Sequence, residues 1–354
     1  MAYDTRFYGL GFSFDSFNGM PYVQLGGCGL RVSCVGLGTW KVGYPERGDK
    51  ARVGRDQAFR ILDRALELGA TFWDTANRYN EASGNSERVL GEWFRAHPGE
   101  RRNIVLATKM AGAMDGVTPN HSGLSRANIL DSVYASLDRL DIDHIDLLQF
   151  HRPDPDTPVE ESLEAVADLR RRDLVRYLGI SNANVEDLMV YRELAHQFGL
   201  PLVASVQNNF NPLDGEREGQ RGVLAFCARN RLAFIPYSPL SRGLLTNRYL
   251  PGRNVGQGDR LVDEGALEKM KGGQVTQQLS RLGELAQQEG FTVAQLSLAY
   301  LLRLPGMGPL IPSASTVEQL EENSRAATIE LRAGVLEQLS QIFVTTAALN
   351  LDNL

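Results

Sequence analysis

Short apolar runs alternate with longer segments of helical period along most of the chain. The first run covers residues 34–37, and the segment after it places apolar side chains on one helical face, at Ala58, Ile61, Leu62, Ala65 and Leu66. Spacings of three and four residues are typical of an amphipathic helix. We expect Asp56 to cap this helix at its start and Gly69 to end it.

This alternation recurs and predicts eight strand–helix units. The expected strands lie at residues 34–37, 71–73, 104–107, 145–150, 175–180, 202–206, 233–235 and 309–311, with helices between them near residues 86–96, 125–140, 185–198 and 222–230. Parallel strands need a crossover helix, so regular alternation predicts a parallel sheet. Closure into a (β/α)8 TIM barrel is the expected fold, and an open doubly wound sheet is the alternative.

Two helix starts carry capping patterns. Thr157 is expected at the N-cap, with Pro158 at the first helical position and Glu160 completing a capping box. A second capping box, Thr316 with Gln319, follows the last predicted strand. A helix start at that place is a ready anion site.

Two segments interrupt the alternation. Within the N-terminal extension, residues 1–32, a hairpin is expected at 22–30 over the barrel floor, and residues 241–273 are expected to form a long loop after strand seven. Long ordered loops on such scaffolds are usually functional. We expect one domain over residues 1–354, with the barrel at 33–330 and a C-terminal segment at 331–354.

Composition narrows the classes of function. The net charge of −6 gives no basic footprint for nucleic acid. No apolar run reaches the ~18 residues of a membrane span, and the first residues lack the pattern of a secretory signal. Three cysteines without CxxC spacing argue against a disulfide framework or a zinc site. We expect a cytoplasmic protein that binds neither membrane nor nucleic acid.

Polar residues at the ends of the predicted strands suggest chemistry. Asp74, Lys109 and His151 end strands two, three and four, and Tyr79 lies in the loop after strand two. In a barrel of this type the carboxyl ends of the strands form the active site. Singly, each residue has a structural explanation, such as an Asp74–Lys109 ion pair at the rim. Together they suit proton transfer to a carbonyl oxygen, with Lys109 expected to lower the pKa of Tyr79.

Three stretches resemble the aldo-keto reductase family. FWDTANRY at residues 72–79, LATK at 106–109 and DHIDLLQFH at 143–151 match the stretches that carry its catalytic tetrad, and the resemblance extends over about residues 22–323. It implies a nicotinamide-dependent oxidoreductase that interconverts aldehydes or ketones with alcohols. The implied catalytic residues are Asp74, Tyr79, Lys109 and His151. Because no side chain supplies a hydride, the reaction needs a cofactor.

The resemblance also implies a cofactor site. Its residues are Gly38, Thr39, Trp40 and Asp74 beside the nicotinamide, Ser181, Asn182 and Gln207 on the carboxamide, Tyr237 stacked on the ring, Ser238, Pro239, Leu240, Gly243 and Leu244 around the pyrophosphate, and Ser313, Ala314, Ser315, Gln319, Glu322 and Asn323 at the adenosine. The stretch GLGTWK at 36–41 is not a Rossmann fingerprint, because Lys41 occupies the place of the last glycine.

The choice between NADP and NAD depends on one position. Many family members have Arg or Lys where this chain has Ser315, and that cation binds the 2′-phosphate of NADP. Arg248 and Arg260 in the long loop are candidate substitutes. We expect NADP, with NAD as the alternative.

The partner is expected to be a small carbonyl or alcohol, contacted by residues at the mouth: Trp40, Trp73, Tyr79, His151 and Arg152. No feature of the sequence selects one such compound or one oligomeric state. An alternative function is a nucleotide-binding regulatory or scaffold subunit, because the resemblance includes potassium-channel beta subunits. A metal-dependent hydrolase is disfavoured, since the five histidines show no HxH or HExxH spacing.

Overall fold

A curled, mostly parallel sheet forms the centre of the molecule. The computed structural model describes residues 13, 15–270 and 272–343. Within them, seven parallel strands pair in sequence order: β4 (Leu37–Gly38), β5 (Phe72–Asp74), β6 (Val105–Met110), β7 (Ile145–Phe150), β8 (Val175–Ser181), β9 (Val203–Asn211) and β11 (Ala233–Tyr237). The short β10 (Gly215–Glu216) adds an antiparallel edge to β9.

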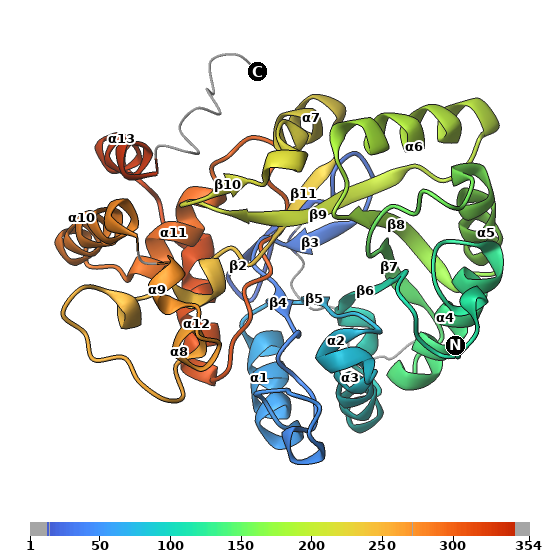
Figure 1. Ribbon diagram of the computed structural model, residues 1–354, viewed down its shortest axis with the longest axis horizontal. Helices are drawn as coiled ribbons and strands as arrows, with labels where there is room; N and C mark the ends of the chain where they lie inside the picture. Colours follow the sequence, from blue (N-terminus) through green and yellow to red (C-terminus); the bar gives the residue numbers. More distant parts are fainter. Residues whose placement is uncertain (1–12, 14, 271, 344–354) are drawn as a thin grey trace.

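Helices cover the outside of this sheet (Figure 1). They are α1 (Arg55–Glu67), α2 (Tyr79–Ala82), α3 (Asn85–Ala96), α4 (Arg126–Leu140), α5 (Val159–Arg171), α6 (Val185–Phe198), α7 (Val223–Asn230), α8 (Arg260–Asp263), α9 (Leu267–Met270), α10 (Gly273–Glu289), α11 (Val293–Leu301), α12 (Val317–Arg325) and α13 (Ala333–Ile342). The buried apolar faces of the longer helices pack on the strands and on one another, whereas α2 is a single turn with left-handed residues.

The segment predicted as the eighth strand lies between the two ends of the sheet. Leu310 forms a parallel bridge to Val35, and Met307 forms one to Phe234 of β11. The Gly36 N–H donates to the Leu310 carbonyl at 2.8 Å. These are isolated bridges rather than a named strand, so the observed architecture is a curled parallel-rich α/β sheet.

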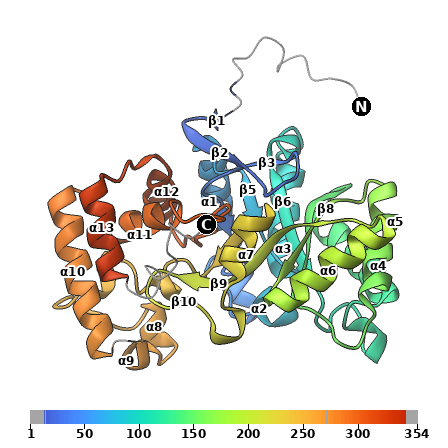
Figure 2. The same cartoon turned by 90° about the horizontal axis from the view of Figure 1, so that it is seen from above.

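A small antiparallel sheet lies at one end of the molecule, opposite α8 and α9 (Figure 2). It consists of β1 (Ser16–Phe17), β2 (Met20–Gln24) and β3 (Arg31–Ser33). The hairpin expected at residues 22–30 is therefore confirmed, with wider limits. Leu25 and Val32 pack with the inward-facing Phe72, Ala107 and Leu147 of the main sheet.

Two helix starts differ from the prediction. Helix α1 begins at Arg55, and its N-cap is Gly54 rather than Asp56. Helix α5 begins at Val159 with Pro158 at the N-cap and without a side-chain cap, so the capping box predicted at Thr157 is wrong. The reason is a competing partner, because the Thr157 hydroxyl donates to the Asp154 carboxylate at 2.7 Å.

The long segment after β11 forms short helical turns. Besides α8 and α9 it contains the 3-10 turns η6 (Ser241–Gly243) and η7 (Asn247–Tyr249). The Arg52 guanidinium, from the β4–α1 loop, pairs with Asp263 of α8 at 3.1 Å. The segment therefore lies over the same end of the sheet as the β4–α1 loop. Parts of the predicted segments 1–32 and 331–354 lie outside the described residues.

Candidate active site

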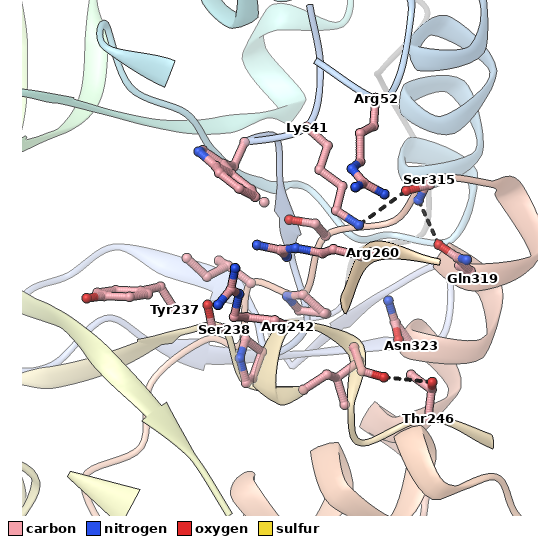
Figure 3. Close-up of a pocket in the computed structure, with 18 of the residues that line it drawn as sticks. Lys41, Arg52, Tyr237, Ser238, Arg242, Thr246, Arg260, Ser315, Gln319 and Asn323 are labelled. Atoms are coloured by element: carbon pink, nitrogen blue, oxygen red, sulfur yellow. Dashed lines mark hydrogen bonds between the residues drawn. The ribbon is translucent and has the colours of Figure 1, made fainter. Parts of the chain in front are cut away.

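A cavity of about 900 Å³ lies at the carboxyl ends of the parallel strands. Most residues predicted for the site contribute to its wall: Gly38, Trp40, Asp74, Tyr79, His151, Ser181, Asn182, Gln207, Tyr237, Ser238, Pro239, Leu240, Gly243, Arg248, Ser313, Ser315, Gln319, Glu322 and Asn323. Segments far apart in the sequence thus meet at one cavity (Figure 3).

Lys109 is the centre of a fully buried polar cluster beneath this wall. Its side chain is 1% exposed, and its ammonium donates to Asp74 Oδ1 at 2.6 Å, to the Thr75 carbonyl at 2.8 Å and to the Tyr79 hydroxyl at 2.7 Å. These contacts use all three donors of an ammonium group. The side chain is therefore held in one orientation, with one of its donors on the phenol oxygen.

Asp74 is held from its other side as well. Gln149 and Gln207 each donate an amide hydrogen to Asp74 Oδ2, at 2.9 and 2.8 Å. Gln149 was not predicted, although it follows from the strand alternation: Leu147, Gln149 and His151 are two residues apart. Gln207 was predicted on the cofactor carboxamide, and in this structure its amide nitrogen contacts Asp74.

Tyr79 lies at the start of an unusual turn. The next three residues, Asn80, Glu81 and Ala82, all have positive φ, between 55° and 62°. Burial, and then the charge of Asp74, raise the pKa of the Tyr79 phenol well above its ordinary value. The net direction is therefore opposite to the lowering that the sequence predicts, because burial and the Asp74 carboxylate set it. The phenol keeps its proton at neutral pH.

His151 lies at the same end of the cavity. Its ring centroid is 6.3 Å from that of Tyr79, in an edge-to-face arrangement. Burial, and then the positive charges of Lys109, Arg78 and Arg152, lower the pKa of the imidazole to about 3. The ring is therefore neutral over the physiological range and can donate a hydrogen bond through one nitrogen.

A buried ion pair supports the strand that carries Lys109. The Thr108 hydroxyl donates to Glu87 at 2.6 Å, and the same carboxylate accepts from Arg139 at 2.7 Å. Glu87 and Arg139 are 0% and 4% exposed. The contact joins α3, α4 and β6 directly behind the Lys109 cluster.

The polar residues at the ends of β8 and β11 contact one another. Tyr237 donates its hydroxyl to Asn182 Oδ1 at 2.9 Å, and the Asn182 amide donates to the His151 carbonyl at 2.9 Å. Ser181 donates to the Gln207 carbonyl at 2.6 Å. These contacts align hydroxyl and amide groups along one side of the cavity.

The chain after β11 bends sharply around the cavity. Ser238, Ser241, Arg242 and Gly243 all have positive φ, and Gly243 reaches 100°. A value this high favours glycine, which lacks the Cβ that would clash. The N–H groups of Ser241, Gly243 and Leu244 donate to carbonyls within this segment, so the turn holds its own shape beside the cavity.

The start of α12 closes the far end of the cavity. Thr316 is the N-cap and accepts from the Gln319 N–H at 3.3 Å, as predicted. The Gln319 side chain does not complete the predicted capping box, because it accepts from the Ser315 N–H at 2.8 Å. The Lys41 ammonium donates to the Ser315 hydroxyl at 3.4 Å.

Cationic side chains gather at this far end. Lys41, Arg52 and Arg260 line the wall around Ser315 (Figure 3). Arg260 also lies over the Trp40 ring, 4.6 Å from its centroid, and pairs with Glu264 at 2.8 Å. Arg260 was predicted from the sequence as a candidate cation, but Lys41 and Arg52 were not. Only the folded β4–α1 loop brings these two residues to Ser315.

Several predicted residues lie outside the described cavity wall. Trp73 is fully buried on the outward side of β5, where its ring packs against Trp93 with centroids 4.8 Å apart. Its neighbour Asp74 points inward, so strand alternation excludes Trp73 from the mouth. Arg152 is exposed and does not line the wall, although its charge acts on the neighbouring His151. Thr39, Leu244 and Ala314 are buried in the fold around the cavity, and the Thr39 hydroxyl donates to the Asp74 carbonyl at 3.0 Å.

The cavity thus combines a buried acid–base cluster with a long polar groove that ends in cations, on a curled parallel sheet. An arrangement of this kind is compatible with an oxidoreductase of carbonyl compounds, and the family comparison supports that class. The model of the Aldo/keto reductase family matches residues 34–343. The chain belongs to the aldo/keto reductase family, whose members generally use nicotinamide cofactors, usually NADPH.

Similar proteins span nearly the whole chain. An aldo-keto reductase of Fusarium vanettenii is 31% identical over 92% of this chain and 91% of its own length. The L-glyceraldehyde 3-phosphate reductase of Escherichia coli O157:H7 is 33% identical over 88% and 89%. A Schizosaccharomyces pombe protein, provisionally named a beta subunit of a voltage-gated potassium channel, is 30% identical over 91% and 93%.

Among the described residues, no group of three or more His, Cys, Asp or Glu side chains is placed to hold a metal ion. None of the helices in the described part of the chain is long and apolar enough to cross a membrane.

Proposed function

We propose that the protein is an NADPH-dependent reductase of an aldehyde or ketone, with Tyr79 as the proton donor. The observation that carries the proposal is the three-way contact of Lys109 with Asp74, Thr75 and Tyr79 beneath the cavity. A buried lysine that holds a phenol at 2.7 Å is suited to stabilise the phenolate that proton transfer creates.

The proposed steps use the phenol proton. Tyr79 donates its proton to the carbonyl oxygen as negative charge develops there. Its raised pKa keeps the proton in place until the oxygen becomes more basic than the phenolate. Lys109 stabilises the phenolate, and Asp74 holds Lys109 charged. Neutral His151 donates a hydrogen bond that orients the carbonyl. In the reverse direction, the phenolate accepts the proton of the alcohol.

Three features of the cavity support a nicotinamide dinucleotide as the cofactor. Amide and hydroxyl groups of Ser181, Asn182 and Tyr237 face its reactive end, a left-handed turn follows at residues 238–243, and cations surround Ser315. The residues proposed to hold the cofactor are the predicted cofactor residues that line the wall. Lys41, Arg52 and Arg260 are added to them. When bound, the reduced cofactor supplies the hydride. Trp40, Tyr79 and His151 remain proposed substrate contacts.

Assays with NADPH and NADH against a carbonyl panel, followed at 340 nm, test this proposal. Tyr79→Phe should lower kcat by about 10² or more, because general acid catalysis contributes ~10²–10⁴. Tyr191→Phe, a buried tyrosine outside the cavity, is the matched control and should stay near wild type. Equal activity of Tyr79→Phe and wild type would contradict the assignment.

A second candidate is a nucleotide-binding subunit of a larger assembly, favoured by the similarity to the provisional channel beta subunit. Tight dinucleotide binding without turnover of any carbonyl would support this candidate over the enzyme.

Other features of the molecule also remain proposals. We infer that the bridges of Leu310 and Met307 close the sheet into the barrel of the family, as one domain. We further propose a cytoplasmic protein that acts on a small carbonyl or alcohol and binds neither membrane nor nucleic acid.

A further inference from the structure

Ser315 is fixed from three directions. Its N–H donates to Gln319, its carbonyl accepts from the Gln57 amide, and its hydroxyl accepts from Lys41 at 3.4 Å. Gln57 belongs to α1 and Gln319 to α12, so two helices hold this short segment in place. The small serine side chain leaves the Lys41 ammonium facing the cavity.

Lys41 and Arg52 are held side by side by the backbone. The Lys41 carbonyl accepts from the N–H groups of Arg52 and Val53, at 2.9 and 3.0 Å. Val42 and Val53 form a parallel bridge in the same loop. Two cations of one loop are therefore presented together at the cavity, opposite Ser315.

The charges at this end are unevenly paired. Arg52 pairs with Asp263, and Arg260 pairs with Glu264. Among the ion pairs of the described residues, none joins Lys41 to a carboxylate. Gathering like charges at one wall is unfavourable unless an anion enters, since opposite charge within a few ångströms favours the charged form.

Other candidate cations are engaged elsewhere. Arg248 pairs with Asp259, which is 6% exposed, and Arg242 pairs with Glu264. Arg260 lies over the Trp40 ring. Lys41 is the cation whose charged atom contacts Ser315 itself.

We propose that Lys41 is the residue by which this chain selects the phosphorylated dinucleotide, because its ammonium binds the 2′-phosphate of the adenosine beside Ser315. The inference rests on the proposed function. It places the selecting cation on the β4–α1 loop rather than at position 315, with Arg52 and Arg260 as weaker contributors.

The same cluster makes selection depend on pH. Burial, and then the charges of Arg260 and Arg52, lower the pKa of Lys41 to about 8, against an opposing effect of Glu264. Asp263 and Arg242 also face this end from the segment after β11. As pH rises through 8, Lys41 loses its charge and the preference for NADP+ should fall. Bound phosphate should raise this pKa, so binding near pH 8 takes up protons.

The test is binding by titration calorimetry of NADP+, NAD+ and 2′,5′-ADP to the full chain at pH 7 and 9. Lys41→Ala should weaken NADP+ and 2′,5′-ADP by roughly ten- to a hundredfold, as loss of a charge-assisted hydrogen bond predicts, and NAD+ by less than about twofold. Lys41→Arg should restore most of the affinity for NADP+ and remove its loss at pH 9. Lys269→Ala, an exposed lysine of α9 outside the wall, is the matched control.

The outcomes separate the two proposals. Suppose that wild type binds NADP+, but Lys41→Ala lowers the affinities for NADP+ and NAD+ equally or changes neither affinity. The selecting role of Lys41 is then wrong, while the reductase proposal stands. If wild type binds no dinucleotide, the proposed function fails and this inference fails with it.

Discussion

The two ends of the cavity differ in how their charges are satisfied. At the reactive end, Lys109 and Asp74 are each 1% exposed and their donors and acceptors are matched. At the far end around Ser315, where the adenosine is proposed to bind (the adenosine end), Lys41, Arg52 and Arg260 are partly exposed. These cations outnumber the carboxylates that pair with them. On the proposed function, the groups that take part in proton transfer are paired within the protein and keep one geometry. The cations at the other end would be paired only when the charged cofactor binds.

The largest expected effect follows from breaking the matched end. Lys109→Met should lower the free energy of unfolding by about 3–5 kcal/mol, because it leaves the Asp74 charge buried without its ion pair. It should also abolish reduction, since the phenolate loses its cation. Urea denaturation and the 340 nm assay measure the two losses, with Lys269→Met as the control. Unchanged stability would show that the hydrogen bonds from Gln149 and Gln207 alone stabilise the buried Asp74 carboxylate.

A smaller effect is expected at the unmatched end. Arg52→Ala should lower the affinity for NADP+ by about three- to tenfold and leave the affinity for NAD+ unchanged. The effect is small because Arg52 is about a third exposed, so water screens its charge. Stability should hardly change. Titration at low and high salt checks this, and the loss should shrink at high salt. A loss larger than that of Lys41→Ala would reverse the order of the two cations.

The smallest effect is expected from pH at the reactive end. Tyr79 has a raised pKa and His151 a pKa of about 3, so neither changes protonation between pH 5 and 9. At saturating NADPH, kcat for reduction should vary by less than about twofold over this range. A decline of kcat as pH falls through about 6.5 would mean that His151 titrates like an ordinary histidine.

The reactive end could be predicted from sequence far better than the adenosine end. Asp74, Lys109 and His151 each end an apolar strand, and parallel strands bring such residues together without further information. Lys41 and Arg52 lie in a loop without periodicity, and only the bridge between Val42 and Val53 sets them beside Ser315. Trp73 was predicted at the mouth because it belongs to the motif of residues 72–79. The alternation of side chains along its strand places it on the outward side instead.

The fold shows the same division. Helix α6 begins and ends at the predicted residues, since Asn184 caps its start by accepting from the Asp187 N–H and Gly199 ends it with φ 64°. The cap at Thr157 was mispredicted because its hydroxyl had a partner, Asp154, that the local pattern does not weigh. Local rules set where apolar periods begin and end, and tertiary contacts decide which polar group takes which partner.

The turn after Tyr79 has a consequence for engineering. Asn80, Glu81 and Ala82 all adopt left-handed backbone angles, each of which costs roughly 1–3 kcal/mol outside glycine. Glycine at position 81 or 82 would relieve this strain and give heat resistance, but it would also loosen the backbone that positions the phenol. Selection for thermostability alone would therefore enrich such variants at the expense of turnover, and selection for turnover would remove them.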